Sequence, residues 1–407
     1  MNCRHCKSHL KHTFLDLGFA PPSNAYLSES ELTRPELYYP LKLKVCTQCW
    51  LVQTEDYAQA DELFLPNYAY FSSTSSSWLA HAKKYVQVIT KQIGLNKKSL
   101  VIEIASNDGY LLKNFVASGI PCLGIEPTAS TAIAAENQGI PVLRDFFGDT
   151  LGERLATEGK QADLIVGNNV YAHVPDINDF TLGLKKVLKK GGTITLEFPH
   201  LMQLIEQTQF DTVYHEHFSY LSLYTVRRIF EQTELRIFDV EELPTHGGSL
   251  RIYGCHENDP RGAAESVHRL LVKESTFGLQ SLSIYKDFQL RVDSVKDELL
   301  LFLLDLKKEG KSIVAYGAAA KGNTMMNFAG VRSDLISYVI DKNPNKQGKF
   351  MPGSRIPIKE GQYLKDNIPD FIIILPWNLQ AEVMSQCESF MKKGGQFVVA
   401  VPELKII

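Results

Sequence analysis

Residues 99–127 read SLVIEIASNDGYLLKNFVASGIPCLGIEP, and this stretch decides the fold. Residues 100–104 form a short apolar run rich in β-branched side chains, as a buried parallel strand requires. The small and polar residues 105–109 follow as a tight loop, whose final glycine lets the backbone turn into a helix. Residues 110–116 give that helix an apolar face, and residues 123–125 form a second strand. The pattern predicts a strand–loop–helix–strand unit at the start of an α/β domain.

The loop between strand and helix indicates the ligand. Glu126 ends the second strand, where an acidic side chain is well placed to accept the two hydroxyl groups of a ribose. The loop lacks the G-x-G-x-x-G spacing of dinucleotide-binding proteins. Its pattern over residues 103–109, acid–x–small–x–small–x–Gly, resembles motif I of class I S-adenosylmethionine (SAM) methyltransferases. The alternative is an ordinary βαβ unit without a ligand.

The composition narrows the class of protein. The chain has 407 residues, of which 44% are hydrophobic and 22% charged, and this suggests two or three domains that each bury a core. A net charge of −3 argues against nucleic acid as the main partner. No run of about 18 apolar residues is present, and the N-terminus MNCRHC has no apolar signal core. We therefore expect a cytoplasmic protein with no membrane span.

Four of the seven cysteines form two C-x-x-C pairs, Cys3 with Cys6 and Cys46 with Cys49. Two residues between cysteines let both thiolates bind one metal ion from a tight turn, and two such knuckles complete a tetrahedral site. We expect a structural zinc site, because a cytosolic setting disfavours disulfides. A redox-active pair and a nucleic-acid-binding zinc ribbon are the alternatives. The other three cysteines stand among apolar neighbours and are expected in the core.

The alternation of strands and helices continues and carries polar groups to one edge of the predicted sheet. The third strand is followed by Asp145 and Phe146, an acid beside aromatic rings that is suited to an adenine. The fourth strand ends in Asn168 and Asn169. Ligands of open α/β sheets lie at the carboxyl ends of such strands, so we expect these side chains near the ligand.

Two further stretches are rich in aromatic residues. Residues 214–221, YHEHFSYL, gather titratable groups of the kind that move a proton. In an extended segment, period-two alternation places His215 and His217 on one face. The alternative is a satisfied hydrogen-bond cluster at a domain border. Residues 66–78, PNYAYFSSTSSSW, are either a linker or, as we favour, a lid or cleft wall that includes Tyr70.

The last third of the chain repeats the nucleotide-fold rhythm. After a mostly helical passage, a strand at 312–318 leads into a second turn of small residues that contains Lys321. Solvated surface is the default for any one lysine. Convergence of Lys321 with the basic loop 342–355, which ends in Arg355, would favour phosphate binding. An H-G-G turn at 246–248 lies between two strands and is also suited to a ligand.

These motifs occur together and in order: the two cysteine knuckles, EIASNDG, GIEP, NNVYAHVPD, YHEHFSYLS, HGGSLR and YGAAAKGN. The set resembles the deoxysugar C-methyltransferases over nearly the whole chain. The resemblance implies a zinc-binding domain at 1–65, a class I (Rossmann-like) SAM methyltransferase domain at 66–245 and a Rossmann-like α/β nucleotide-sugar-binding domain at 246–407. It also implies a 4-keto-6-deoxysugar linked to dTDP or GDP as substrate, methylated on the carbon next to its ketone, C-3.

The resemblance and the positions of the motifs in the predicted elements together assign roles to individual residues. The expected catalytic residues are the base His217 with Tyr214, Glu216, His173 and Tyr70. The expected cofactor residues are Glu103, Ala105, Asn107, Asp108, Gly109, Glu126, Asp145, Phe146, Asn168 and Asn169. The expected substrate residues are His246, Gly247, Arg251, Lys321, Asn323 and Arg355. A sugar O- or N-methyltransferase and an NAD(P)-dependent nucleotide-sugar epimerase or reductase are the alternatives. We expect a monomer, because no heptad seam or long apolar surface pattern is present.

Overall fold

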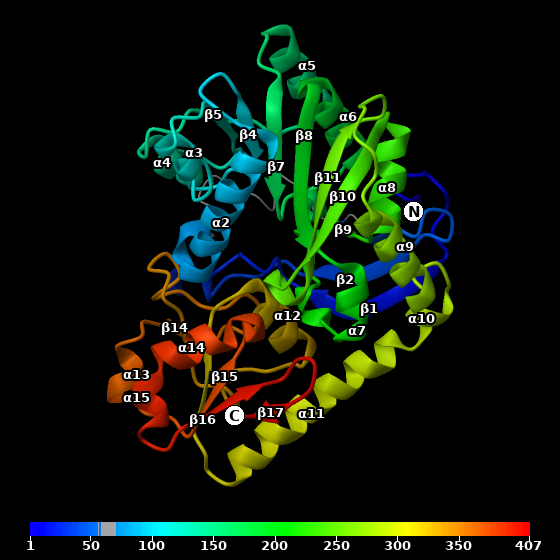
Figure 1. The fold of residues 1–407 in the computed structure, drawn as a ribbon. Helices are drawn as coiled ribbons and strands as arrows, with labels where there is room; N and C mark the ends of the chain where they lie inside the picture. The colour runs from blue at the N-terminus through cyan, green and yellow to red at the C-terminus, as the bar shows by residue number, and fades with distance from the viewer. Residues whose placement is uncertain (56, 58–70) are drawn as a thin grey trace.

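A seven-stranded sheet lies in the middle of the chain (Figure 1). The computed structural model describes residues 1–55, 57 and 71–407. In sheet order the strands are β10 (Leu235–Leu243), β11 (Ser249–His256), β8 (Leu188–Pro199), β7 (Ala162–Asn168), β4 (Val101–Ile104), β5 (Cys122–Ile125) and β6 (Val142–Leu143). The strands from β6 to β8 run parallel, and β11 is antiparallel to both β8 and β10. The predicted α/β domain is therefore confirmed.

Helices cover both faces of this sheet, because its buried strands place apolar side chains in two cores. Ile102 and Ile104 belong to one core, whereas Val101 points into the other. The helices on the side of Val101 are α2 (Ser76–Ile93), α3 (Leu112–Ala117) and α4 (Ala129–Glu136). Those on the other side are α5 (Asp149–Thr157), α6 (Ile177–Val187), α8 (Leu223–Gln232) and α9 (Glu265–Phe277).

A second, antiparallel sheet combines the N-terminus with a strand from much later in the chain. In sheet order its strands are β1 (His12–Ala20), β2 (Tyr39–Val45), β3 (Val52–Thr54) and β9 (Ser219–Tyr220). Val52 pairs with Tyr220, and Gln53 pairs with Ser219. The strand that follows the YHEH motif thus completes the sheet that carries the cysteine knuckles.

The C-terminal sheet is the second Rossmann-like unit that the sequence predicts. In sheet order its strands are β14 (Ile358–Lys359), β13 (Val339–Ile340), β12 (Ile313–Tyr316), β15 (Phe371–Ile374), β16 (Gln396–Val399) and β17 (Lys405–Ile406). All neighbours except β16 and β17 pair in parallel. Its helices are α12 (Ala320–Phe328), α13 (Tyr363–Asp366), α14 (Gln380–Gln386) and α15 (Glu388–Met391).

The N-terminal and C-terminal sheets share one hydrophobic core. That core also includes α7 (Leu201–Glu206), α10 (Ser283–Lys286) and α11 (Phe288–Lys308). Phe14 of β1 stacks on Phe288 with ring centres 4.7 Å apart and meets the edge of Tyr285 at 5.3 Å. The Tyr26 hydroxyl also donates to the Ala318 carbonyl at 2.6 Å. The long yellow helix α11 runs along this shared core in Figure 1.

Several polar residues of the chain lie on short 3₁₀ turns. They are η1 (Glu29–Glu31), η2 (Ser72–Thr74), η3 (Tyr171–His173), η4 (Phe210–Thr212), η5 (Thr245–Gly247) and η6 (Trp377–Leu379). The expected domain boundary between residues 245 and 246 falls inside the β10–β11 hairpin, so strands from both sides of it build the middle sheet. Among the helices of the described residues, none combines the length and apolarity needed to cross a membrane.

Candidate active site and zinc centre

The loop after β4 coils tightly enough to surround part of a small ligand. Ala105, Asn107 and Gly109 take left-handed φ values of 55°, 49° and 77°. Glu126 at the end of β5 supports this shape, because its carboxylate accepts the backbone amides of Asn107 at 2.9 Å and Thr128 at 3.0 Å. The predicted cofactor loop and the predicted acid, Glu126, are therefore hydrogen-bonded to each other.

Acidic and unpaired polar groups collect beside this loop. Neither amide atom of Asn168 has a hydrogen-bond partner among the described residues, although the side chain is buried. Burial and the charges of Asp108 and Glu126 raise the pKa of Glu103 well above its usual range, and Tyr110 opposes this only in part. A cationic ligand group would relieve the repulsion and supply the missing hydrogen bonds. The ammonium group of SAM has this chemistry, so these residues fit the cofactor.

The segment that leads into α2 is attached to the cofactor loop. The backbone amide of Ser72 donates to the Asn107 side chain at 2.9 Å, and that of Ser73 donates to Asp108 at 3.0 Å. The expected lid residue Tyr70 lies just before this anchor and outside the described residues. The lid that includes Tyr70 stays a prediction.

His217 lies at the centre of a cluster of aromatic rings. Its ring centre is 4.0 Å from that of Tyr214 and 4.5 Å from that of His173. Nδ1 of His217 is 3.0 Å from the Thr212 carbonyl oxygen. A carbonyl only accepts, so Nδ1 carries the proton and Nε2 keeps its lone pair. Burial and His173 hold the pKa of His217 well below its usual range, which keeps the ring neutral at pH 7.

The predicted alternation of residues 214–217 is wrong. The His217 amide donates to the Tyr214 carbonyl at 2.9 Å, which closes a turn and brings these two side chains together. His215 points instead toward the N-terminal sheet, where its Nε2 lies 3.2 Å from the Pro40 carbonyl. The two histidines therefore do not share a face, because period-two alternation holds only in extended backbone.

His173 and Glu216 are hydrogen-bonded to each other beside His217. The His173 ring is hydrogen-bonded to the backbone carbonyl of Glu216, and burial lowers the pKa of His173 to about 4. The Glu216 carboxylate accepts from the Asn24 amide at 3.1 Å, and burial raises its pKa. The N-terminal segment thus contributes a side chain to the second layer of the site.

Asn169 and His246 form a second wall of the candidate site, and both have left-handed backbone conformations. Asn169 has φ 54° and His246 has φ 55°, and the Asn169 amide nitrogen lies 2.8 Å from Nε2 of His246. Trp78 of α2 packs its ring edge-on to His246 at 5.1 Å. Burial, with Lys321 as the next cause, lowers the pKa of His246 to about 4.

Glu197 of β8 joins this wall together, and the sequence analysis did not identify it. Its fully buried carboxylate accepts from Arg251 at 2.6 Å and from Thr245 at 2.9 Å, and it pairs with His81 at 2.9 Å. Its backbone carbonyl accepts the Asn169 amide at 2.7 Å. Burial acts to raise the pKa of Glu197, but these partners lower it below its usual value.

Lys321 lies at the border of the C-terminal unit. Its Nζ donates to Asn378 at 3.0 Å and lies 4.3 Å from the ring centre of Trp377. The Trp377 indole in turn donates to Asp211 at 2.7 Å. Burial lowers the pKa of Lys321 to about 8, although the Asp211 charge opposes the change. Its charge in turn lowers the pKa values of His217 and His246, as a nearby cation does.

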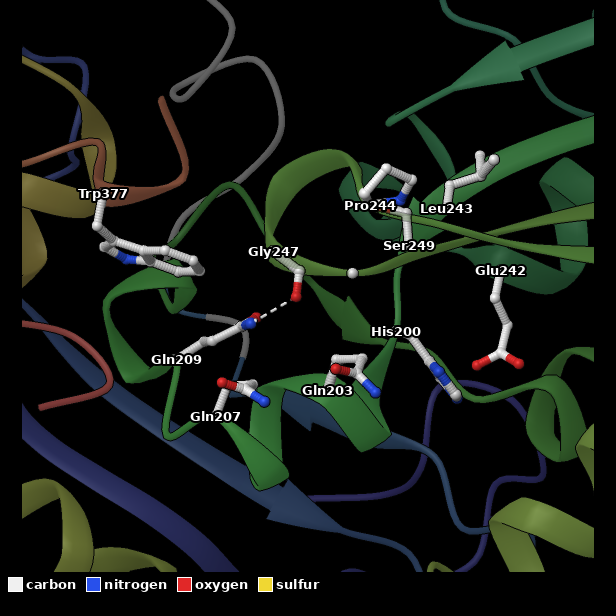
Figure 2. Close-up of a pocket in the computed structure, with 11 residues that line it drawn as sticks. His200, Gln203, Gln207, Gln209, Glu242, Leu243, Pro244, Gly247, Ser249 and Trp377 are labelled. Carbon is white, nitrogen blue, oxygen red and sulfur yellow. Dashed lines mark hydrogen bonds between the residues drawn. The ribbon is translucent and has the colours of Figure 1, made fainter. Parts of the chain in front are cut away.

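An open pocket of about 430 Å³ lies next to this border (Figure 2). It is lined by Trp377, by Gly247 and Gly248 of the H-G-G turn, and by three glutamines that include Gln209. The Gln209 amide donates to the Gly247 carbonyl at 2.7 Å. Gly247 packs so closely against the Trp377 ring that no side chain would fit there. Among the predicted site residues that the structure describes, Gly247 alone lines this pocket.

Three predicted substrate residues have partners within the chain, and their contact with a substrate stays a prediction. Arg251 is buried in the Glu197 network, with Tyr85 under its guanidinium at 4.4 Å. Asn323 is buried within α12, where its carbonyl groups accept from Asn327. Arg355 donates to the carbonyls of the N-terminal residues 32 and 34. The partners of Arg251 and Arg355 come from distant parts of the chain, so sequence spacing gave no sign of them.

The third strand ends at the surface. The Phe146 side chain is 51% exposed, and Asp145 lies 3.4 Å from Arg154. Both remain accessible to a ligand at the carboxyl edge of the sheet.

Other residues of the site that sequence reasoning missed are His81, Asp211 and Trp377. Trp377 stands in a Pro-Trp-Asn turn directly after the apolar run 371–375, which is the one signal that would have pointed to it.

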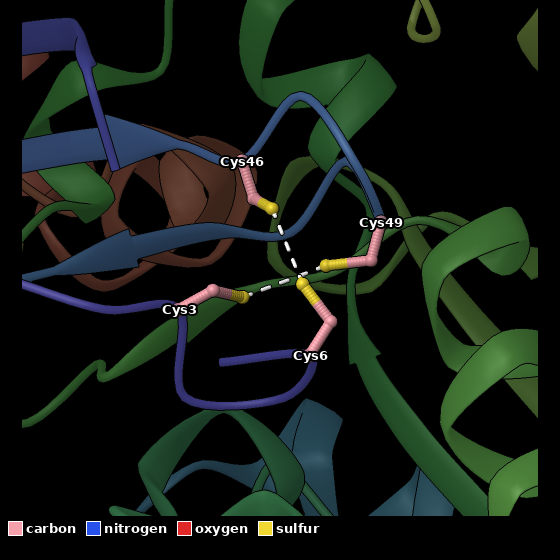
Figure 3. A group of neighbouring side chains, drawn as sticks. All are labelled: Cys3, Cys6, Cys46 and Cys49. Atoms are coloured by element: carbon pink, nitrogen blue, oxygen red, sulfur yellow. Dashed lines mark hydrogen bonds between the residues drawn. The ribbon is translucent and has the colours of Figure 1, made fainter. Parts of the chain in front are cut away.

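The four cysteines of the two knuckles meet in one place (Figure 3). The sulfur atoms of Cys3 and Cys49 are 3.5 Å apart, as are those of Cys6 and Cys46, and all four lie within 4.8 Å of one another. Thiolates bound to tetrahedral zinc at 2.3 Å are separated by about 3.8 Å. The donor set therefore fits a closed structural zinc site, as predicted.

The sheet order, the cofactor loop and the cysteine cluster together define a SAM-dependent methyltransferase with a zinc domain. Three domain families match in order: a zinc binding domain over residues 3–64, a methyltransferase domain over 78–240 and a C-methyltransferase C-terminal domain over 244–402. The chain is 31% identical over 405 residues to the C-methyltransferase NovU of Streptomyces niveus, covering 100% of this chain and 96% of NovU. The chain belongs to this C-methyltransferase family.

Solved structures resemble parts of the chain. An S-adenosylmethionine-dependent methyltransferase from Clostridium acetobutylicum matches 43% of this chain and 91% of its own, with 10% identity and a TM-score of 0.35. Magnesium protoporphyrin IX methyltransferase from Synechocystis with bound SAM matches 44% of this chain and 80% of its own, with 14% identity and a TM-score of 0.33.

Proposed function

We propose that this C-methyltransferase acts on a 4-keto-6-deoxysugar linked to dTDP or GDP, as a monomer, and methylates C-3 next to the ketone with His217 as the base. One observation carries the proposal. His217 donates through Nδ1 to the Thr212 carbonyl, which leaves the lone pair of Nε2 on a buried and neutral ring. Carbon methylation needs such a group, because a C–H bond must lose its proton before the carbon can act as a nucleophile.

The proposed chemistry begins at the ketone. A hydrogen on the neighbouring carbon becomes acidic enough for an imidazole when the enolate oxygen is stabilised. His173 already donates its single proton to Glu216, so the neutral ring has no second proton to give. The donor to the enolate is therefore a tyrosine hydroxyl, from Tyr214 or from Tyr70. Bound SAM supplies the electrophilic methyl group.

The proposal also assigns residues to the two substrates. Glu103 and Asp108 take the ammonium end of SAM within the coiled loop. Glu126 takes the ribose, while the exposed pair Asp145 and Phe146 is available to the adenine. The remaining proposed cofactor contacts are Ala105, Asn107, Gly109, Asn168 and Asn169. The proposed substrate contacts are His246, Gly247 and Lys321, whose charge suits a diphosphate.

The test measures proton exchange and methyl transfer separately. The protein is incubated in D₂O with nucleotide-linked 4-keto-6-deoxysugars, without SAM, and deuterium at the carbon next to the ketone is scored by mass spectrometry. SAM is then added and the gain of one methyl group is scored. We expect the wild type to do both. His217→Asn should lose exchange by about 100-fold or more, because general base catalysis contributes about that much.

A matched control uses His215→Asn, since that histidine belongs to the same motif but points toward Pro40. It should keep most of its exchange activity. Undiminished exchange in His217→Asn would remove this residue from the role of base. Methyl transfer to oxygen or nitrogen without any exchange at carbon would contradict the proposed reaction itself.

A further inference from the structure

Arg4 stands inside the first cysteine knuckle, but its side chain leaves the zinc centre. It is 6% exposed. Its Nη1 donates to the Pro175 carbonyl at 2.6 Å, and its Nη2 donates to the Thr54 carbonyl at 3.3 Å. The guanidinium carbon lies 5.3 Å from the ring centre of Phe218. One planar fork therefore contacts three segments that are distant in sequence.

Two of these segments carry the histidines of the candidate site. Pro175 follows η3, which ends at His173, and Phe218 directly follows His217. The third contact strengthens the link, because the Thr54 amide donates to the Phe218 carbonyl at 3.2 Å. Arg4 thus joins both catalytic loops to the edge of the N-terminal sheet.

The rest of the first knuckle is fixed to the start of α6, the helix that follows the His173 loop. The His5 ring lies 2.8 Å from the Asn178 side chain, which also donates to the His5 carbonyl at 2.9 Å. The knuckle is closed at its ends by Cys3 and Cys6, so its backbone has little freedom once the four sulfurs hold their metal. A rigid knuckle gives Arg4 a fixed starting point.

We propose that Arg4 is a positioning residue that sets the distance and angle between the rings of His173 and His217. Its fork spans two carbonyls at once and stacks on Phe218, and a lysine cannot do all three. The consequence for turnover rests on the proposed role of His217, whereas the consequence for ring geometry does not. The zinc domain thereby contributes to the reaction without contacting the substrate.

The experiment compares Arg4→Lys and Arg4→Met with the matched control Arg228→Met. Arg228 also holds a knuckle, since it donates to the Gln48 carbonyl at 2.9 Å, but it contacts Tyr224 of α8 and neither catalytic loop. Zinc content and the dissociation constant for SAM should match the wild type in Arg4→Lys and Arg228→Met. Long-range ¹⁵N spectra of histidine-labelled protein should show shifted ring signals for His173 and His217 in both Arg4 variants only.

Turnover gives a second readout. Both Arg4 variants should lose about 10- to 100-fold in kcat, as misplaced catalytic groups do. The KM of the sugar should change little. Unchanged histidine signals and kcat in Arg4→Lys with normal zinc content would overturn the proposal, and so would equal changes in Arg228→Met. If the wild type itself transfers no methyl group, the proposed function fails, while the histidine signals still decide the role of Arg4.

Discussion

Burial keeps the histidines of the candidate site neutral. For this reason the free energy of unfolding depends on pH. The pKa of His246 lies at about 4 in the folded chain, mainly because of burial. In the unfolded chain it returns to about 6.5. Between these values the unfolded chain binds more protons than the folded chain, so the free energy of unfolding falls as the pH falls.

For one such histidine the loss between pH 7 and pH 5 is about 2 kcal/mol. Urea denaturation at both pH values compares the wild type with His246→Asn, since asparagine tolerates the left-handed backbone at this position. The variant should lose about 2 kcal/mol less than the wild type on acidification. The exposed His12→Asn is the control and should lose as much as the wild type. Equal losses in all three proteins would contradict the expectation.

At the scale of elements, strand β8 holds the Asn169–His246 wall of the site together through Glu197. This carboxylate is the buried partner of Arg251, whose other acid, Glu241, is 44% exposed in its side chain. Removing one partner of a buried pair leaves an uncompensated charge, whereas an exposed pair contributes little. Arg251 therefore has one strongly coupled and one weakly coupled acidic partner within the same sheet.

Glu197→Gln should therefore lower the free energy of unfolding by about 3 kcal/mol, and Glu241→Gln by less than about 1 kcal/mol. Urea titrations at pH 7 measure both. Glu197→Gln should also loosen the turn that carries Thr245, which amide hydrogen exchange reports. Similar unfolding energies for the two variants would show that the buried network does not hold the wall.

The sequence predicted elements better than turns. Apolar runs and acidic strand ends located β4, β5 and their loop, because burial of a parallel strand restricts its composition directly. The arrangement of residues 214–217 was not predictable, since one backbone hydrogen bond from His217 to Tyr214 converts an extended segment into a turn. The partners of Arg355 and Arg251 were not predictable for a related reason, because long side chains find partners that no local pattern records.

At the scale of the whole molecule, contacts around the zinc centre tie the N-terminal sheet to the middle domain. The Thr225 hydroxyl donates to the Cys49 carbonyl at 3.1 Å, so the second knuckle packs against the start of α8. Three thiolates alone cannot complete a tetrahedral site. Loss of the metal should therefore loosen the middle sheet as well as the N-terminal one.

Cys49→Ser, or removal of zinc with a chelator, tests this expectation. Hydrogen exchange should speed up in β1, β2, β3, β9 and the first turn of α8, whereas the buried strands β12 and β15 should keep their protection. Cys387→Ser, a buried cysteine far from the knuckles in sequence, is the control and should leave the N-terminal sheet unchanged. Uniform loss of protection would mean that the chain unfolds as one unit.

The short pairing of β3 with β9 can form only after the ribosome has made both strands. Thr54 and Phe218 are 164 residues apart in the chain. A ribosome adding 5–20 residues per second needs roughly 10–30 seconds to cover that interval. During this time β3 leaves the tunnel with an open edge, which is a ready template for a foreign strand. Glu55 directly follows β3, so a charged side chain stands at the end of that edge and disfavours pairing with a foreign strand.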